Sequence, residues 1–192
     1  RPPRAGAPTA QPRTPRDDDP ARPRQAECRR ARPDASALSA DLRARVELLL
    51  QTHHVMTLAT HDGQAPWAAA VFYAPDGLDL LFLSKSSTRH ARGLTHDSRC
   101  AVTIQRDYRD WPQITGIQAE GRCTELHGAE RDRARAVYAQ RFPLVGPAGG
   151  APAKIAQALA RVGWYRFRPQ RLYLIDNALG FGHRDELDCT AG

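Results

Sequence analysis

Residues 55–84 read VMTLATHDGQAPWAAAVFYAPDGLDLLFLS, and this stretch decides the class of fold. It holds three apolar runs, at 55–60, 65–74 and 78–84. The runs are separated by His61-Asp62-Gly63-Gln64 and by Pro75-Asp76-Gly77, which are compositions typical of tight turns. Because tight turns join antiparallel neighbours, the sequence predicts an antiparallel sheet built from consecutive strands.

The rest of the chain extends this pattern. Further strands are predicted at 99–106, 114–126 and 164–175, and helices at 39–53, 88–95, 129–142 and 153–162. Six strands with few, short helices predict a mainly β fold with flanking helices. We expect a six-stranded antiparallel barrel, because closure removes exposed strand edges.

The first 37 residues differ in composition from the remainder. They contain 8 of the 15 prolines and 9 arginines, but no Ile, Leu, Val, Phe, Trp or Tyr. A segment without such side chains cannot offset its ordering entropy, so 1–37 are predicted to be a disordered tail and 38–192 one domain. Nine arginines against five acids give the tail four of the seven excess positive charges. No aromatic residue lies among these arginines to stack on bases, so nucleic acid is not an expected partner.

The four cysteines, Cys28, Cys100, Cys123 and Cys189, are widely spaced. There is no Cys-x-x-Cys pair, and no histidine pair has a metal-ligand spacing, so no metal site is expected. Nothing indicates a disulfide framework, which favours the cytoplasm. No apolar run approaches the roughly 18 residues of a membrane span, so no membrane association is expected.

A phosphate-binding corner is predicted where the third strand passes into a short helix. Ser84, Lys85, Thr88, Arg89 and His90 follow the apolar run directly. A helix N-terminus offers backbone N–H groups, and these side chains add hydroxyls and positive charge. A solvated loop followed by an ordinary capped helix would have the same composition.

The order of segments resembles the FMN-binding split-barrel flavoproteins related to pyridoxamine 5′-phosphate oxidase. The resemblance lies in the hairpin at 57–63, the corner at 82–94 and the strand at 116–121. The stretches at 138–143, 164–167 and 176–182 look like a small bacterial subfamily. This resemblance implies a homodimer with FMN at the subunit interface, Ser84, Arg89 and His90 at the phosphate, and Gln118 near the flavin. The strand that includes Val71 and Phe72 would lie along the isoalloxazine ring.

Two positions depart from the family pattern. His90 stands where the family usually has Lys, and Arg171-Leu172-Tyr173 stands where the vitamin B6 oxidases carry Arg-x-His. Oxidation of pyridoxamine phosphate is therefore not assigned. The expected function is an FMN-dependent oxidoreductase that transfers two electrons between the flavin and a small substrate, with no catalytic residue identified.

Alternatives remain open at the sequence level. The same barrel could hold a flavin or haem without turnover, and a deazaflavin could replace FMN. Residues 176–182 either buttress the barrel as a turn or cover the mouth of the site. In the second case His183 and Arg184 would face an anionic substrate.

Overall fold

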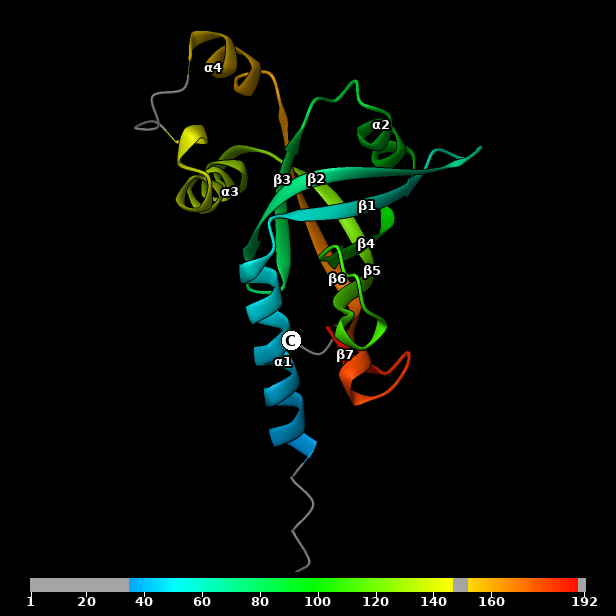
Figure 1. Cartoon of the computed structure of the whole chain (residues 1–192). Coiled ribbons are helices and arrows are strands. Elements are labelled where there is room, and N and C mark those ends of the chain that lie inside the picture. The colour runs from blue at the N-terminus through cyan, green and yellow to red at the C-terminus, as the bar shows by residue number, and fades with distance from the viewer. Residues whose placement is uncertain (1–34, 147–151, 190–192) are drawn as a thin grey trace, which may run out of the picture. The chain divides into compact units, whose positions relative to one another are not determined.

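The computed structural model describes residues 35–146 and 152–189 (Figure 1). The predicted disordered tail therefore lies outside the described residues, except for its last three, which belong to the first helix. That helix starts four residues before the predicted 39. Among the described residues, no helix is long and apolar enough to cross a membrane.

Four helices and seven strands make up the described chain. The strands are β1 (Val55–His61), β2 (Pro66–Asp76), β3 (Asp79–Ser84), β4 (Arg99–Gln105), β5 (Thr115–Leu126), β6 (Gly163–Asp176) and β7 (Arg184–Asp188). The helices are α1 (Ala35–Thr52), α2 (Arg89–His96), α3 (Gly128–Arg141) and α4 (Ala153–Leu159). Three single 3₁₀ turns add to them, η1 (Trp111–Gln113), η2 (Pro143–Val145) and η3 (Asn177–Leu179).

The strands close into a six-stranded antiparallel barrel, which confirms the predicted fold class. They are hydrogen-bonded in the order β3-β2-β1-β4-β5-β6-β7, and an additional β3–β6 pairing closes the ring. β5 occupies one edge of β6 along almost its whole length. The other edge of β6 is divided, because residues 163–167 pair with β3 and residues 171–175 pair with β7. β7 therefore lies outside the closed ring.

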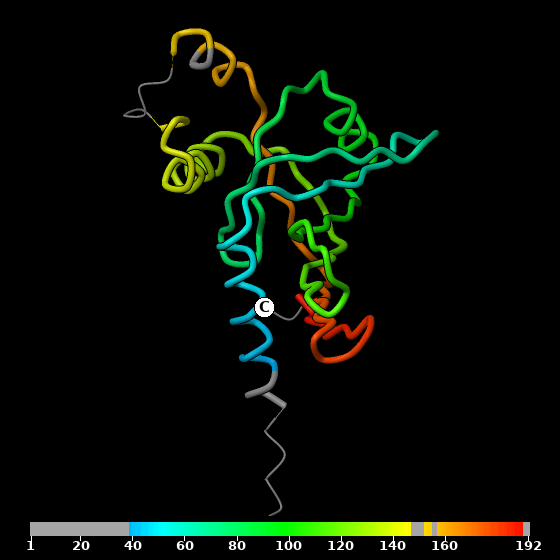
Figure 2. Tube along the Cα trace, viewed as in Figure 1, coloured from blue at the N-terminus to red at the C-terminus, as the bar shows by residue number. Residues whose placement is uncertain are grey.

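The seventh strand was not predicted from the sequence. β7 reads Arg-Asp-Glu-Leu-Asp, and Leu187 is its one buried residue. Four charged residues out of five give no apolar alternation, so only pairing with β6 defines the strand. Figure 2 shows the chain leaving β6, turning through η3 and returning along β7.

β2 and β3 diverge along part of their length, although the β3–β6 pairing keeps the barrel closed. Two of the predicted cofactor residues, Val71 and Ser84, lie where the two strands separate. Residues 73–76 of β2 pair with β3, whereas residues 66–72 pair with β1. Beyond the Tyr73–Phe82 pair, β3 continues beside β6. β2 and β3 therefore part at the register position that holds Val71 on one strand and Ser84 on the other.

Buried and outward-facing residues alternate along the strands, and the buried ones form the core. Met56, Leu58, Val102 and Ile104 are buried, while the residues between them face outward. Cys100 and Cys123 are buried free thiols, as small apolar residues in strands should be. In α3, the buried residues are Ala134 and Tyr138, which lie one turn apart on one face of the helix.

A bulge bends β6 against β5 between Glu120 and Gly121. Gly121 lies against the backbone here, because a Cβ added to it would meet the Arg168 carbonyl oxygen at 2.1 Å. The position therefore admits no side chain.

Candidate functional site

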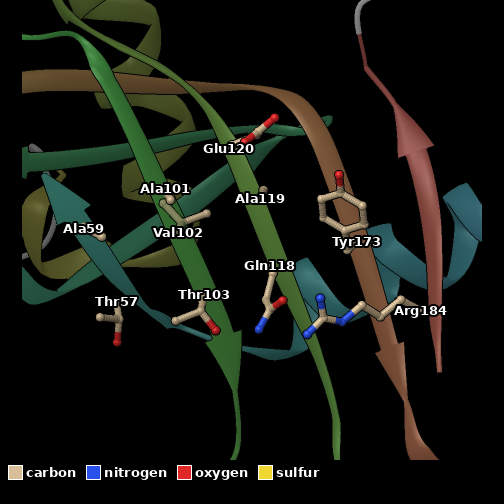
Figure 3. A pocket seen from close by; sticks show the side chains of 10 residues that line it. All are labelled: Thr57, Ala59, Ala101, Val102, Thr103, Gln118, Ala119, Glu120, Tyr173 and Arg184. Atoms are coloured by element: carbon tan, nitrogen blue, oxygen red, sulfur yellow. The ribbon is translucent and has the colours of Figure 1, made fainter. Parts of the chain in front are cut away.

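A cavity of about 460 Å³ lies on the outer face of the barrel over β1, β4, β5 and β6 (Figure 3). It is built from outward-facing residues that the strand register places in rows. One row runs Thr57, Thr103, Gln118 and Tyr173 across the four strands. Ala59, Ala101 and Glu120 form the next row. The small side chains of β1 and β4 leave the space, and the larger ones of β5 and β6 border it.

A second cavity of about 350 Å³ adjoins the first and shares Thr103 and Gln118 with it. It extends toward the loop after β4, where it is lined by Arg106, Tyr108 and Ile114 among others. Gly116 lines it too, and it occupies the row after Gln118. Because glycine has no side chain, the outer face is hollow at this position.

The predicted phosphate corner forms a compact cluster of hydroxyls and imidazole. The Ser84 hydroxyl lies 2.7 Å from His90 Nε2 and 3.0 Å from the Thr88 hydroxyl. Thr88 is the N-cap of α2 and accepts a hydrogen bond from the backbone N–H of Ala91. Lys85 is exposed beside the cluster, and its carbonyl accepts from the Thr88 hydroxyl at 2.9 Å. Thr88 therefore belongs both to the predicted phosphate corner and to the N-cap of α2, so the two interpretations of the sequence describe the same residues.

Burial lowers the pKa of the His90 imidazole below its ordinary value, which favours the neutral form. Ser84 is 7% exposed and His90 is partly buried. The imidazole and the two hydroxyls can exchange donor and acceptor roles with one another or with a bound oxyanion.

Arg89 points away from this cluster. Its guanidinium lies 3.4 Å from an Asp62 carboxylate oxygen and 4.6 Å from the centroid of the Trp67 ring. The backbone N–H groups of Ala65 and Gln64 hold the pKa of Asp62 at about 2, with Arg89 contributing less. The carboxylate therefore stays charged and fixes the arginine at the β1–β2 turn.

The predicted site residues thus fall into four places, one of which is the β1–β2 turn that holds Arg89. Ser84, Lys85, Thr88 and His90 come together at the start of α2. Val71 lies at the parting of β2 and β3, half-buried against the core, whereas Phe72 is 59% exposed and packs edge-on against Phe142. Gln118 lies in the outer cavity, and neither cavity is lined by residues of the corner.

The structure shows the first of the two roles that the sequence allowed for the C-terminal stretch. Asp176 caps η3 and pairs with Arg45 of α1 at 2.7 Å, so the turn buttresses the barrel. Arg184 lines the outer cavity, but His183 lies 3.1 Å from Asp185 and is not among the cavity residues. That residues 183 and 184 face an anionic substrate therefore stays a prediction, with Arg184 at the cavity and His183 outside its lining.

Most residues that line the cavity were not predicted from the sequence. Thr57, Thr103 and Arg106 were not singled out, because each sits in an ordinary strand or strand end. The sequence feature that could have indicated the cavity is the small outward-facing residues at alternate positions of β1 and β4. Strands usually carry larger side chains at such positions. In the described part of the chain, no group of three His, Cys, Asp or Glu residues is arranged to hold a metal ion.

Comparison with known proteins places the fold in a family. Residues 42–176 match the family described as Pyridoxamine 5'-phosphate oxidase. A UPF0306 protein of Enterobacter sp. (strain 638) is 33% identical over 143 residues, which cover 73% of this chain and 92% of that protein.

Among solved structures, a haem binding protein from Mycobacterium smegmatis superposes with a TM-score of 0.59 at 22% identity. The match covers 82% of this chain and 59% of that one, so this chain spans about three fifths of its length. The haem storage protein HutZ of Vibrio cholerae gives a TM-score of 0.55 at 16% identity, covering 68% and 92%. At these identities the two structures support the fold alone.

Proposed function

Because the chain belongs to the pyridoxamine 5'-phosphate oxidase family, we propose that it binds FMN and transfers two electrons between the flavin and a small substrate. The flavin supplies the redox chemistry when bound, and the protein supplies binding, orientation and electrostatics. The hydroxyls and the imidazole of the site fit this division, since such groups can bind a ligand through hydrogen bonds while the flavin does the redox chemistry.

One observation carries the proposal. The hydroxyls of Ser84 and Thr88, the imidazole of His90 and the amino-terminal end of α2 converge at one corner. Hydroxyls, a titratable imidazole and helix N–H groups suit a phosphate monoester, and Lys85 adds a nearby positive charge. The corner also adjoins the place where β2 and β3 separate. There, residues 66–72 of β2 pair with β1 on one edge, and the opposite edge pairs with no described strand.

The cofactor content of the purified protein tests this assignment. We expect protein purified from cells to carry a flavin that absorbs near the wavelengths typical of FMN, with mass spectrometry identifying the mononucleotide. Lys85→Ala removes the positive charge beside the corner, and should weaken FMN binding roughly ten- to a hundredfold. Arg135→Ala, at an exposed position of α3, is the matched control. Full FMN occupancy of Lys85→Ala would count against the corner as the phosphate site.

Haem is the second candidate, and the haem proteins among the structural relatives favour it. A Soret band in the purified protein, with porphyrin identified by mass, would select haem over FMN. Reduction of the bound flavin by NADH or NADPH would then separate an enzyme from a carrier.

We also propose a homodimer formed through the outer face, with the cofactor at the interface. The face carries small exposed residues on adjacent strands, including Ala59, Ala68 and Ala70. Small side chains let a second sheet approach closely. Ala70→Arg should give monomers by light scattering, whereas Ala136→Arg on the exposed side of α3 should leave a dimer intact. A dimeric Ala70→Arg variant would place the interface elsewhere.

A further inference from the structure

Two arginines beside the outer cavities differ from most others in the described chain. Nine arginines between Arg43 and Arg171 form ion pairs with acidic side chains. Arg184 and Arg106, by contrast, have no carboxylate partner within the described ranges. Arg184 lines the first cavity and Arg106 lines the second.

The acidic residues that flank Arg184 are engaged by other groups. Asp185 lies 3.7 Å from Arg45 and 3.1 Å from His183. Glu186 lies 3.9 Å from the Nε of Arg171. The positive charge of Arg184 is therefore left unneutralised by its neighbours on β7.

The register directs Arg184 over the hollow part of the face. It pairs with Ile175, which pairs with Gly116, so its row contains the position that lacks a side chain. Figure 3 shows the Arg184 side chain extending from β7 across β6 toward Gln118. Glu120 lies two rows away, at the opposite end of the cavity, where Arg171 is 3.9 Å from it. One end of the cavity is thus cationic, and the carboxylate is at the other.

We propose that Arg184, with Gln118 and with Arg106 from the adjoining cavity, binds the anionic group of a small organic substrate. The planar guanidinium matches a carboxylate or phosphate with two parallel N–H donors, and the Gln118 amide adds a further donor. The body of the ligand lies over Ala101, where the small side chain leaves room. This inference rests on the proposed function, since it assigns the class of substrate for the proposed flavoenzyme: organic anions rather than neutral or cationic molecules.

The test compares two probes of nearly equal shape, benzoate and its neutral analogue benzamide. Dissociation constants are measured by calorimetry on the full chain and on three variants: Arg184→Gln, Arg106→Gln and the control Arg135→Gln. We expect the wild type to bind benzoate at least roughly tenfold more tightly than benzamide. Arg184→Gln should abolish that preference, Arg106→Gln should reduce it, and Arg135→Gln should leave it unchanged.

The cofactor content of each variant separates this inference from the proposed function. Loss of the benzoate preference with unchanged FMN content supports a substrate subsite. Loss of the cofactor in Arg184→Gln would overturn it, because the anion bound there would then belong to the cofactor itself. Equal affinities for benzoate and benzamide in the wild type would also overturn it. If FMN is absent but benzoate remains preferred through Arg184, the anion site stands and the flavin proposal falls.

Discussion

We predict that the proposed binding of an FMN phosphate at the corner takes up a proton, because burial lowers the pKa of the free His90 imidazole. In the unliganded corner, burial lowers the pKa of His90, and Ser84 and Thr88 are its hydrogen-bond partners at 2.7 and 3.2 Å. A bound phosphate carries about −1.5 to −2 charges and favours the imidazolium. The pKa of His90 is therefore higher in the complex than in the free protein.

The direction and the size of the pH effect on FMN affinity follow from the linkage between proton binding and FMN binding. Between the two pKa values the complex holds one more proton than the free protein, so affinity increases as pH falls. A single proton changes the dissociation constant by at most about tenfold per pH unit. The phosphate itself has a second pKa of about 6, so the informative window lies above about pH 6.5. His90→Gln should bind FMN with little pH dependence across this window.

Titration of the cofactor-free protein, followed by quenching of flavin fluorescence, measures the effect between about pH 6.5 and 8.5. His96→Gln, on the exposed side of the same helix, is the control and should keep the wild-type slope. An affinity that is independent of pH in the wild type would refute the reasoning. A slope that survives in His90→Gln would refute it as well, because the proton would then be taken up elsewhere.

Three further predictions concern stability. Arg141 of α3 donates hydrogen bonds to the carbonyls that end α1, including that of Gln51 at 3.0 Å, so Arg141→Met should lower the free energy of unfolding by about 2–3 kcal/mol in urea titrations; a change within about 0.5 kcal/mol would contradict this. Thr88→Ala removes the N-cap of α2 and should cost about 1 kcal/mol in the same assay, with an unchanged value counting against the cap. In the unliganded protein, the lowered pKa of His90 makes stability fall as pH falls through about 6.5, where the unfolded chain binds the proton more readily. His90→Gln should remove that contribution from the pH dependence of thermal melting, and an identical pH profile in the variant would exclude it.

The local parts of this fold could be read from the sequence. Turn residues such as Gly63 and Gly77 adopt positive φ, and alternation in β1 and β4 set the buried face before any partner strand was known. The corner at Thr88 was also local, since a cap and its helix are neighbours along the chain. These features depend on interactions within a few residues, which sequence patterns record directly.

Only the tertiary structure decided where the site residues meet. Thr57, Gln118 and Tyr173 are distant in sequence, and the register of four strands places them in one row. The same pairing created β7 from a charged segment and carried Arg184 to the cavity. It also separated Arg89 from Ser84, because Asp62 holds the arginine at another turn. Side-chain direction depends on long-range pairing, and neither composition nor local periodicity specifies which strands become neighbours.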